Sequence, residues 1–223
     1  MTLRLFFNAL SKIILGFILI VFLIFLPAGT LNFPNGWIFM SVLFVPMIFA
    51  GAIMVFKCPE RIKHRLNAKE TQKEQRLIVK LSGLMFIAGF IVAGLDFRFG
   101  WTRISPVVVI IAAILFLIAY LLYVEVMREN PYLSRTIEIQ QNQKVIDTGL
   151  YAIVRHPMYT ATILLFLTIP IILGSLWAFL IFLAYPSIIA SRIKFEEEFL
   201  EKELLGYCDY KQKVKYRLIP FVW

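Results

Sequence analysis

Charged residues are scarce in this chain of 223 residues. Only 17% of the residues are charged and 60% are hydrophobic, whereas soluble domains have about 25% charged and 45–50% apolar residues. The mean hydropathy of +0.80 points the same way. This composition excludes an ordinary soluble domain and predicts an integral membrane protein.

Cysteine and repeated sequence are also lacking. The two cysteines, Cys58 and Cys208, are far apart and belong to no metal-ligand spacing, so we expect free thiols and no metal site. We find no internal repeat, which argues against a transporter built from repeated halves. The net charge of +9 comes from basic residues next to apolar runs, and attraction to anionic lipid headgroups explains it more simply than nucleic acid does.

Long apolar runs are what the sequence does contain. A helix needs about 20 apolar residues to cross a hydrocarbon core of about 30 Å. The uncharged run from Pro157 to Ser191 is too long for one crossing, and Gly174-Ser175, which follows Pro170, predicts a break that makes it a helical hairpin. We therefore predict an all-α, polytopic membrane bundle of about six crossings. Before the hairpin come four runs, at Leu10–Leu26, Trp37–Phe56, Leu77–Leu95 and Ile104–Val124.

Basic residues predict the orientation, because cytoplasmic loops are enriched in Lys and Arg. Residues 27–36 carry no charge, whereas residues 57–80 carry eight Lys or Arg. Within the latter, the charged stretch 70–76 suits a helix at the membrane surface. Residues 96–101 mix charge with aromatic rings and suit the opposite interface. We expect a cytoplasmic location for both termini and for the basic segments 57–80, 128–156 and 192–217.

The composition changes at Glu125, after the fourth run. This change divides the chain into membrane helices over residues 1–124 and a functional region over residues 125–223. Alternation over residues 137–146 favours an extended segment, and Asp147-Thr148-Gly149 favours a turn.

The strongest local signal is the stretch 149–159, where a polar loop enters the apolar hairpin. Pro157 suits the first turn of a helix, whose free amides can receive polar or anionic groups of a ligand. His156, Tyr151 and Tyr159 would stand at that mouth. The alternative is structural: His156 caps the helix and the tyrosines belong to an aromatic belt.

Arg192 and Glu196 lie at the other end of the same hairpin. They are four residues apart and share a helix face, so a simple surface ion pair would explain them. The hairpin, however, returns them to the membrane face that holds His156, and ionisable groups at the edge of a membrane bundle are functional candidates. A third signal, the stretch 206–220, predicts a short basic and aromatic tail resting on the membrane.

Together, in this order and spacing, these blocks resemble the isoprenylcysteine carboxyl methyltransferase family. The family pattern joins a Gly-x-Tyr turn, Arg-His-Pro-x-Tyr, a two-helix membrane hairpin, a Glu-Glu pair and a Tyr-x-x-Tyr tail. This chain carries that pattern within residues 125–223, whereas its N-terminal half matches only in being helical and membrane-spanning. The resemblance, closest to the short prokaryotic-type members, implies a membrane-embedded methyltransferase that uses S-adenosylmethionine.

Carried over by position, the resemblance implies that Arg192 meets the substrate as the catalytic residue. Arg217 is not assigned, because related proteins differ at that point of the tail. The acceptor would be lipophilic, either an isoprenylcysteine carboxylate or another lipid, and we expect no obligate protein partner. The cofactor-binding residues implied are Gln143, Lys144, Val145, Ile146, Tyr151, His156, Pro157, Met158, Tyr159 and Glu196.

Methyl transfer depends on positioning more than on acid–base chemistry. A carboxylate acceptor is already ionised at neutral pH, and Arg192 would orient it. An amine acceptor needs a base, for which Glu197 and Glu125 are the nearest residues. Two other functions stay open: an NADPH-dependent membrane sterol-type reductase, which resembles this chain in its His-Pro-x-Tyr hairpin, and a small non-enzymatic transporter, which would place ionisable residues in mid-crossing.

Overall fold

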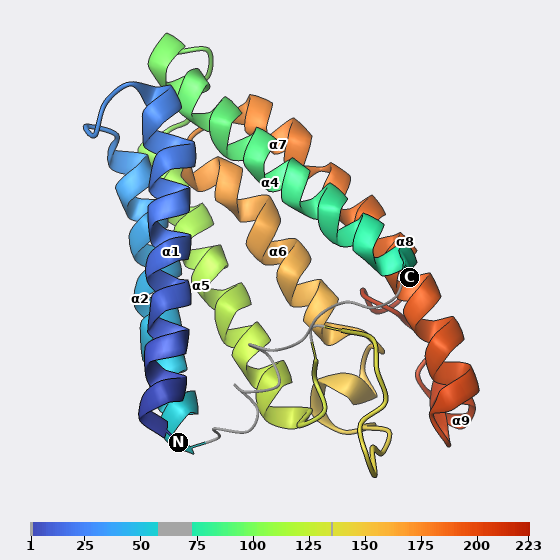
Figure 1. The fold of residues 1–223 in the computed structure, drawn as a ribbon. Helices are drawn as coiled ribbons and strands as arrows, with labels where there is room; N and C mark the ends of the chain where they lie inside the picture. Colours follow the sequence, from blue (N-terminus) through green and yellow to red (C-terminus); the bar gives the residue numbers. More distant parts are fainter. Residues whose placement is uncertain (1, 58–72, 135) are drawn as a thin grey trace.

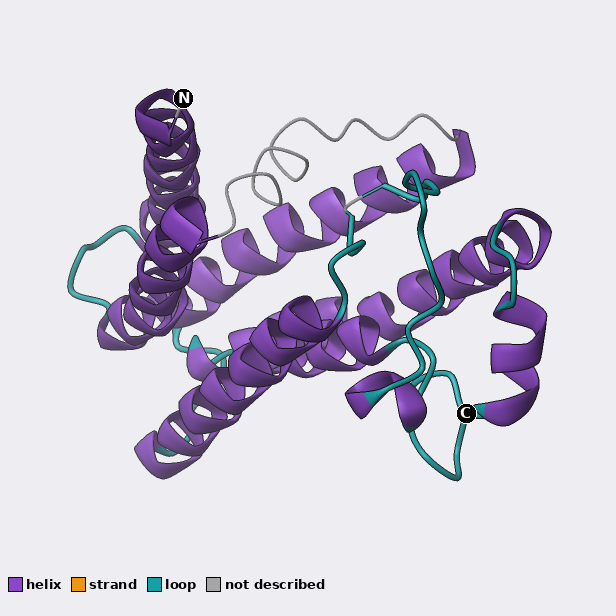
Figure 2. Cartoon of the chain, turned by 90° about the horizontal axis from the view of Figure 1, so that it is seen from below, coloured by secondary structure: helices purple, strands orange, loops and turns teal. Residues whose placement is uncertain are grey.

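The computed structural model describes residues 2–57, 73–134 and 136–223. This part of the chain contains helices and no strand (Figure 1, Figure 2), so the all-α prediction is confirmed. Cys58 and most of the charged stretch after it lie outside the described residues. Of the predicted surface helix, residues 73–76 are described, and they begin a long membrane helix instead.

Four long helices come first and run up and down the bundle. They are α1 (Thr2–Ala28), α2 (Pro34–Lys57), α4 (Lys73–Phe99) and α5 (Pro106–Glu129). They cover the four predicted apolar runs, except that α5 begins two residues late, at Pro106, because proline suits the first turn of a helix. After an irregular segment follow η1 (Gly149–Ala152), α6 (Pro157–Ile172), α7 (Leu176–Phe182), α8 (Ala184–Glu203) and α9 (Tyr207–Lys213).

The hairpin forms where it was expected. In the described part of the chain, five stretches are long and apolar enough to cross a membrane, and the fifth, Leu176–Glu203, runs through α7 and α8. The shorter apolar helix α6 adds a sixth. Gly174 takes a left-handed conformation with φ +81°, which glycine adopts without strain. The Ser175 hydroxyl then accepts a hydrogen bond from the Ala178 N–H and caps α7.

Phenylalanine rings fill the centre of the bundle. α5 packs along α6, α1 packs against α2 and α4, and α4 packs against α7. A Cβ atom at Gly89 would lie 2.3 Å from the ring of Phe182, so the absence of a side chain there lets α4 and α7 approach closely. The buried rings in contact come from four helices and belong to Phe39, Phe90, Phe116 and Phe182.

Asp96, near the C-terminal end of α4, joins this helix to the hairpin through Ser175, the residue that caps α7. Its carboxylate is 1% exposed and accepts hydrogen bonds from the Thr102 N–H at 2.7 Å and from the Ser175 hydroxyl at 2.5 Å. The expectation of an interfacial loop fits Phe99 and Trp101, whose exposed rings stack. It is wrong for Asp96, because this carboxylate is buried.

Replacing Asp96 tests this junction. Asp96→Ala leaves two donors without their acceptor, and each buried unsatisfied group costs about 1–3 kcal/mol. We expect a clear fall in the midpoint of thermal unfolding of the detergent-purified protein. Asp96→Asn keeps an oxygen for Thr102 and an amide for Ser175, so its loss should be much smaller. Equal melting of the wild type and both variants would show that the junction contributes no stability.

Candidate active site

An irregular segment between α5 and α6 forms one wall of the site. In its described residues the chain is not helical before η1, as expected for residues 137–146. Gly149 has φ +54°, and a Cβ atom there would lie 1.6 Å from a carboxylate oxygen of Glu129. The same carboxylate accepts the Leu150 N–H at 2.9 Å. Only glycine fits this turn, which begins η1 and leaves Tyr151 buried.

Glu197 is a buried carboxylate that joins α8 to the start of α6 and to the tail. One oxygen accepts from Arg155 Nε at 2.7 Å and lies 3.2 Å from His156 Nε2. The other accepts from Arg217 Nε at 2.9 Å. The side chains of Arg155 and Glu197 are only 4% and 3% exposed. A buried ion pair persists only when further hydrogen bonds satisfy it, and this carboxylate has them on both oxygens.

The segment that follows α9, residues 214–217, runs beside the start of α6. The guanidinium of Arg155 donates to two carbonyl oxygens of this segment, at 2.7 and 2.8 Å. The backbone N–H groups of Arg155 and His156 donate to two more, each at 2.9 Å. The tail therefore packs directly against the site instead of only resting on the membrane.

Glu196 is adjacent to Glu197 in sequence but makes a different set of contacts. The hydroxyl of Tyr159 donates to Glu196 at 2.5 Å and accepts from Arg192 Nε at 2.9 Å. A chain of hydrogen bonds thus links Arg192 and Glu196 through a tyrosine of α6. The structural alternative for Tyr159 and His156 is wrong, because Tyr159 is buried and His156 makes no side-chain cap.

Tyrosines of α9 complete the wall. The Tyr210 hydroxyl donates to the carbonyl oxygen of Tyr151 at 2.7 Å, and the Tyr151 hydroxyl accepts from Asn130 at 3.0 Å. The Tyr207 hydroxyl is buried and has no hydrogen-bond partner among the described residues. Burial raises the pKa of all three tyrosines, so they remain neutral hydrogen-bond donors at physiological pH.

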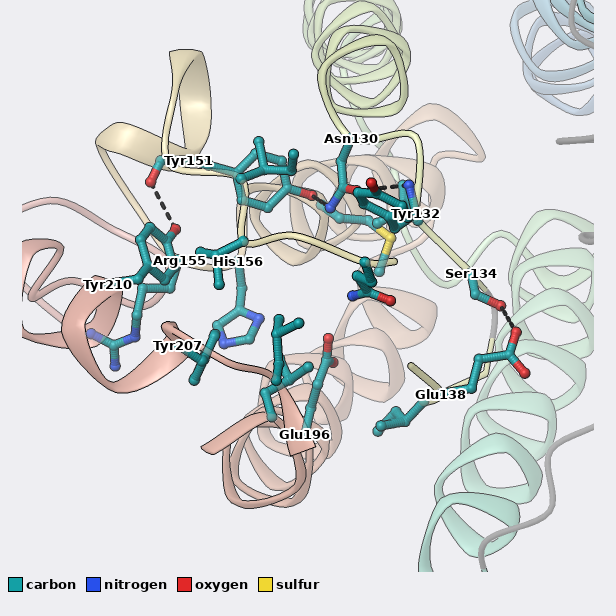
Figure 3. Close-up of a pocket in the computed structure, with 18 of the residues that line it drawn as sticks. Asn130, Tyr132, Ser134, Glu138, Tyr151, Arg155, His156, Glu196, Tyr207 and Tyr210 are labelled. Carbon is teal, nitrogen blue, oxygen red and sulfur yellow. Dashed lines mark hydrogen bonds between the residues drawn. The ribbon is translucent and has the colours of Figure 1, made fainter. Parts of the chain in front are cut away.

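These walls surround a pocket that is open at its mouth. Figure 3 shows His156, Glu196 and Tyr207 close together in it. Pro157 does not line the pocket; it is buried at the first position of α6. The other predicted residues all line it: Gln143, Lys144, Val145, Ile146, Tyr151, His156, Met158, Tyr159, Arg192 and Glu196.

Sequence reasoning missed Arg155, Tyr207 and Asn130, which also line the pocket. Arg155 could have been recognised, because an arginine beside a membrane helix needs a buried partner. Neither expected base lines the pocket. Glu197 is held by three basic side chains, and Glu125 forms an ion pair with Arg128 at the surface.

The fold is that of a multi-pass membrane protein, and part of the chain matches a methyltransferase family. Residues 107–204, which run from α5 to just past the end of α8, match the phospholipid methyltransferase family. No curated protein sequence matches the chain. The predicted class and the predicted family resemblance are confirmed.

One solved structure has a similar fold over nearly the whole chain. It is a eukaryotic intramembrane Ras methyltransferase, an isoprenylcysteine carboxyl methyltransferase. The alignment covers 99% of this chain and 85% of that one, with a TM-score of 0.54 and 19% sequence identity. At this identity the similarity concerns the fold, and it includes the N-terminal helices for which the sequence pattern was uninformative.

Removing the Glu197 carboxylate tests whether the site depends on it. Glu197→Ala leaves Arg155 buried without its counter-ion, a change that costs about 3–5 kcal/mol in buried pairs. We expect a large fall in thermal stability. The control is Glu198→Ala, one residue along α8, where the side chain is exposed and the loss should be small. Similar melting of the two variants would contradict a structural role for Glu197.

Proposed function

We propose that the pocket binds S-adenosylmethionine and that the protein transfers the methyl group to a lipophilic acceptor from the bilayer. The observation that carries the proposal is the convergence of α6, α8, α9 and the segment before η1 on one polar pocket, within or beside the region that matches a methyltransferase family. The same match favours a methyltransferase over the reductase and the transporter.

The residues present fit such a cofactor. Tyr207 offers a buried hydroxyl that lacks a partner in the described structure, and a ligand acceptor would satisfy this group. Lys144 and His156 provide basic groups for an anionic end of the cofactor, and Glu196 provides a carboxylate for a cationic one. Gln143, Val145 and Ile146 provide a wall of backbone amide and apolar groups.

When bound, S-adenosylmethionine supplies a methyl group on a positively charged sulfur. A protein that uses such a donor gains most by holding the reacting groups in line. Glu196 can stabilise the positive charge, and the hydrogen bond from Tyr159 fixes the orientation of that carboxylate. The second bond of Tyr159, from Arg192 Nε, fixes the guanidinium at the same time.

Arg192 is the residue that we assign to the acceptor. An arginine guanidinium binds a carboxylate or phosphate by paired hydrogen bonds, so Arg192 would orient an acidic acceptor or the phosphate of a lipid headgroup. Neither Glu197 nor Glu125 lines the pocket, so neither stands where it could serve as the base for an amine acceptor. A carboxylate acceptor would need no base, because it is ionised at neutral pH.

Isothermal titration of the detergent-purified protein with S-adenosylmethionine is the direct test. We expect saturable binding by the wild type. Glu196→Gln and Tyr159→Phe should weaken it at least tenfold, since each removes a charged or charge-assisted contact worth roughly 1.5–3 kcal/mol. Glu198→Gln, on the exposed side of α8, is the matched control. Binding of NADPH, or no binding by the folded wild type, would reject the proposal.

Orientation is part of the same proposal, because the cofactor must enter from the cytoplasm. Cys208 is a free, exposed thiol on α9, beside the pocket. In intact cells producing the Cys58→Ser variant, we expect a membrane-impermeant maleimide to label Cys208 only after the membrane is permeabilised. Labelling of intact cells would place the pocket on the opposite side.

A further inference from the structure

The last ten residues expose apolar side chains outside every membrane-spanning stretch. Ile219, Phe221 and Val222 are 52%, 88% and 74% exposed, and they form a turn that we call the apolar tip. Exposed apolar groups are expected on helices that face lipid, but a cluster beyond those helices marks an interaction surface.

The apolar tip is held beside the membrane bundle. The Thr160 hydroxyl, in the first turn of α6, donates to the carbonyl oxygen of Leu218 at 2.8 Å, and Leu218 is buried in the main core. The C-terminus lies well above the lower ends of α5 and α9 in Figure 1. Viewed from below, it lies toward one side of the molecule (Figure 2). The tip is thus at the depth where a membrane helix begins.

The backbone conformation that exposes Phe221 is strained. Its φ of +65° is one of two positive values among the described residues other than glycine, and bulky side chains avoid this region. The turn is fixed by Trp223, whose carbonyl oxygen accepts N–H groups of residues 217–219. Such strain persists only where the surrounding structure imposes it, and its result here is an apolar ring exposed beside the bundle.

Positive charge precedes the tip. Lys213 and Lys215 are exposed, and they flank the buried Val214. Basic residues next to apolar ones at the membrane surface attract anionic headgroups. Apolar side chains of the same segment can then enter the boundary between headgroups and acyl chains.

We propose that residues 213–222 form a contact with anionic lipids, in which the apolar tip enters the acyl boundary and the two lysines bind the headgroups. The contact is joined to the site. Arg217, between the lysines and the tip, donates to Glu197 at 2.9 Å, and its guanidinium lies over the Trp223 ring at 5.2 Å. Lipid bound here therefore holds the segment that completes the polar cluster around Glu197.

Fluorescence quenching of a labelled tip tests the contact without reference to methyl transfer. The full chain, with Cys58→Ser and Cys208→Ser, carries Phe221→Cys and an environment-sensitive fluorophore in nanodiscs of phosphatidylcholine with or without phosphatidylglycerol. The matched control is Leu205→Cys. Leu205 is 97% exposed but lies past the end of a 28-residue span, about 42 Å of helix, beyond the hydrocarbon core.

We expect the label at position 221 to be quenched by a nitroxide carried on the lipid and protected from aqueous iodide, with the reverse at position 205. Quenching by the lipid should be stronger in anionic nanodiscs, and Lys213→Gln with Lys215→Gln should remove the difference. Iodide quenching as strong at position 221 as at position 205, or quenching independent of anionic lipid, would overturn the proposal. If Phe221→Cys does not fold, Val222→Cys gives the same comparison.

Discussion

A carboxylate buried at the edge of a membrane bundle requires cations or hydrogen-bond donors around it, and Glu197 obtains them from separate parts of the chain. Arg155 and His156 come from the start of α6, and Arg217 comes from the tail. If one of these segments moved away from the others, a charged side chain would be left buried without its partner or would become exposed. The requirement to neutralise one carboxylate therefore determines how α6, α8 and the tail meet, and it fixes the wall of the pocket.

Two adjacent glutamates consequently do different work. Glu197 is almost fully enclosed and has its oxygens occupied by basic side chains. Glu196 lines the pocket and accepts a hydrogen bond from the Tyr159 hydroxyl, which itself accepts one from Arg192. One carboxylate holds the structure, and the other is presented to a ligand. At the far end of the bundle, Asp96 has a similar structural task for the hairpin that carries both. Polar groups are few in this chain, and most of the buried ones that the structure describes join the end of a helix to a neighbouring segment.

The spans were predictable because the length of an apolar run and the thickness of a bilayer are directly comparable. Gly174-Ser175 was predictable because the backbone has few ways to turn a membrane helix back. The pocket residues followed from a spaced pattern shared with a family. The sequence pattern did not predict which of the two neighbouring carboxylates, Glu196 or Glu197, would be buried. It also did not predict that the Asp96 side chain would be buried, although Asp96 begins an aromatic loop. Those outcomes depend on distances between segments far apart in sequence, such as Glu197 and Arg155, and linear patterns do not contain them.

The 28-residue stretch through α7 and α8 is charged from Arg192 onward. Its apolar part, residues 176–191, corresponds to about 24 Å of helix, which is shorter than a hydrocarbon core of about 30 Å. A helix with a short apolar part is accommodated by local thinning of the bilayer or by flanking side chains that reach to the interface. Bilayer thickness therefore bears on the depth at which Arg192 and Glu196 stand relative to the membrane surface.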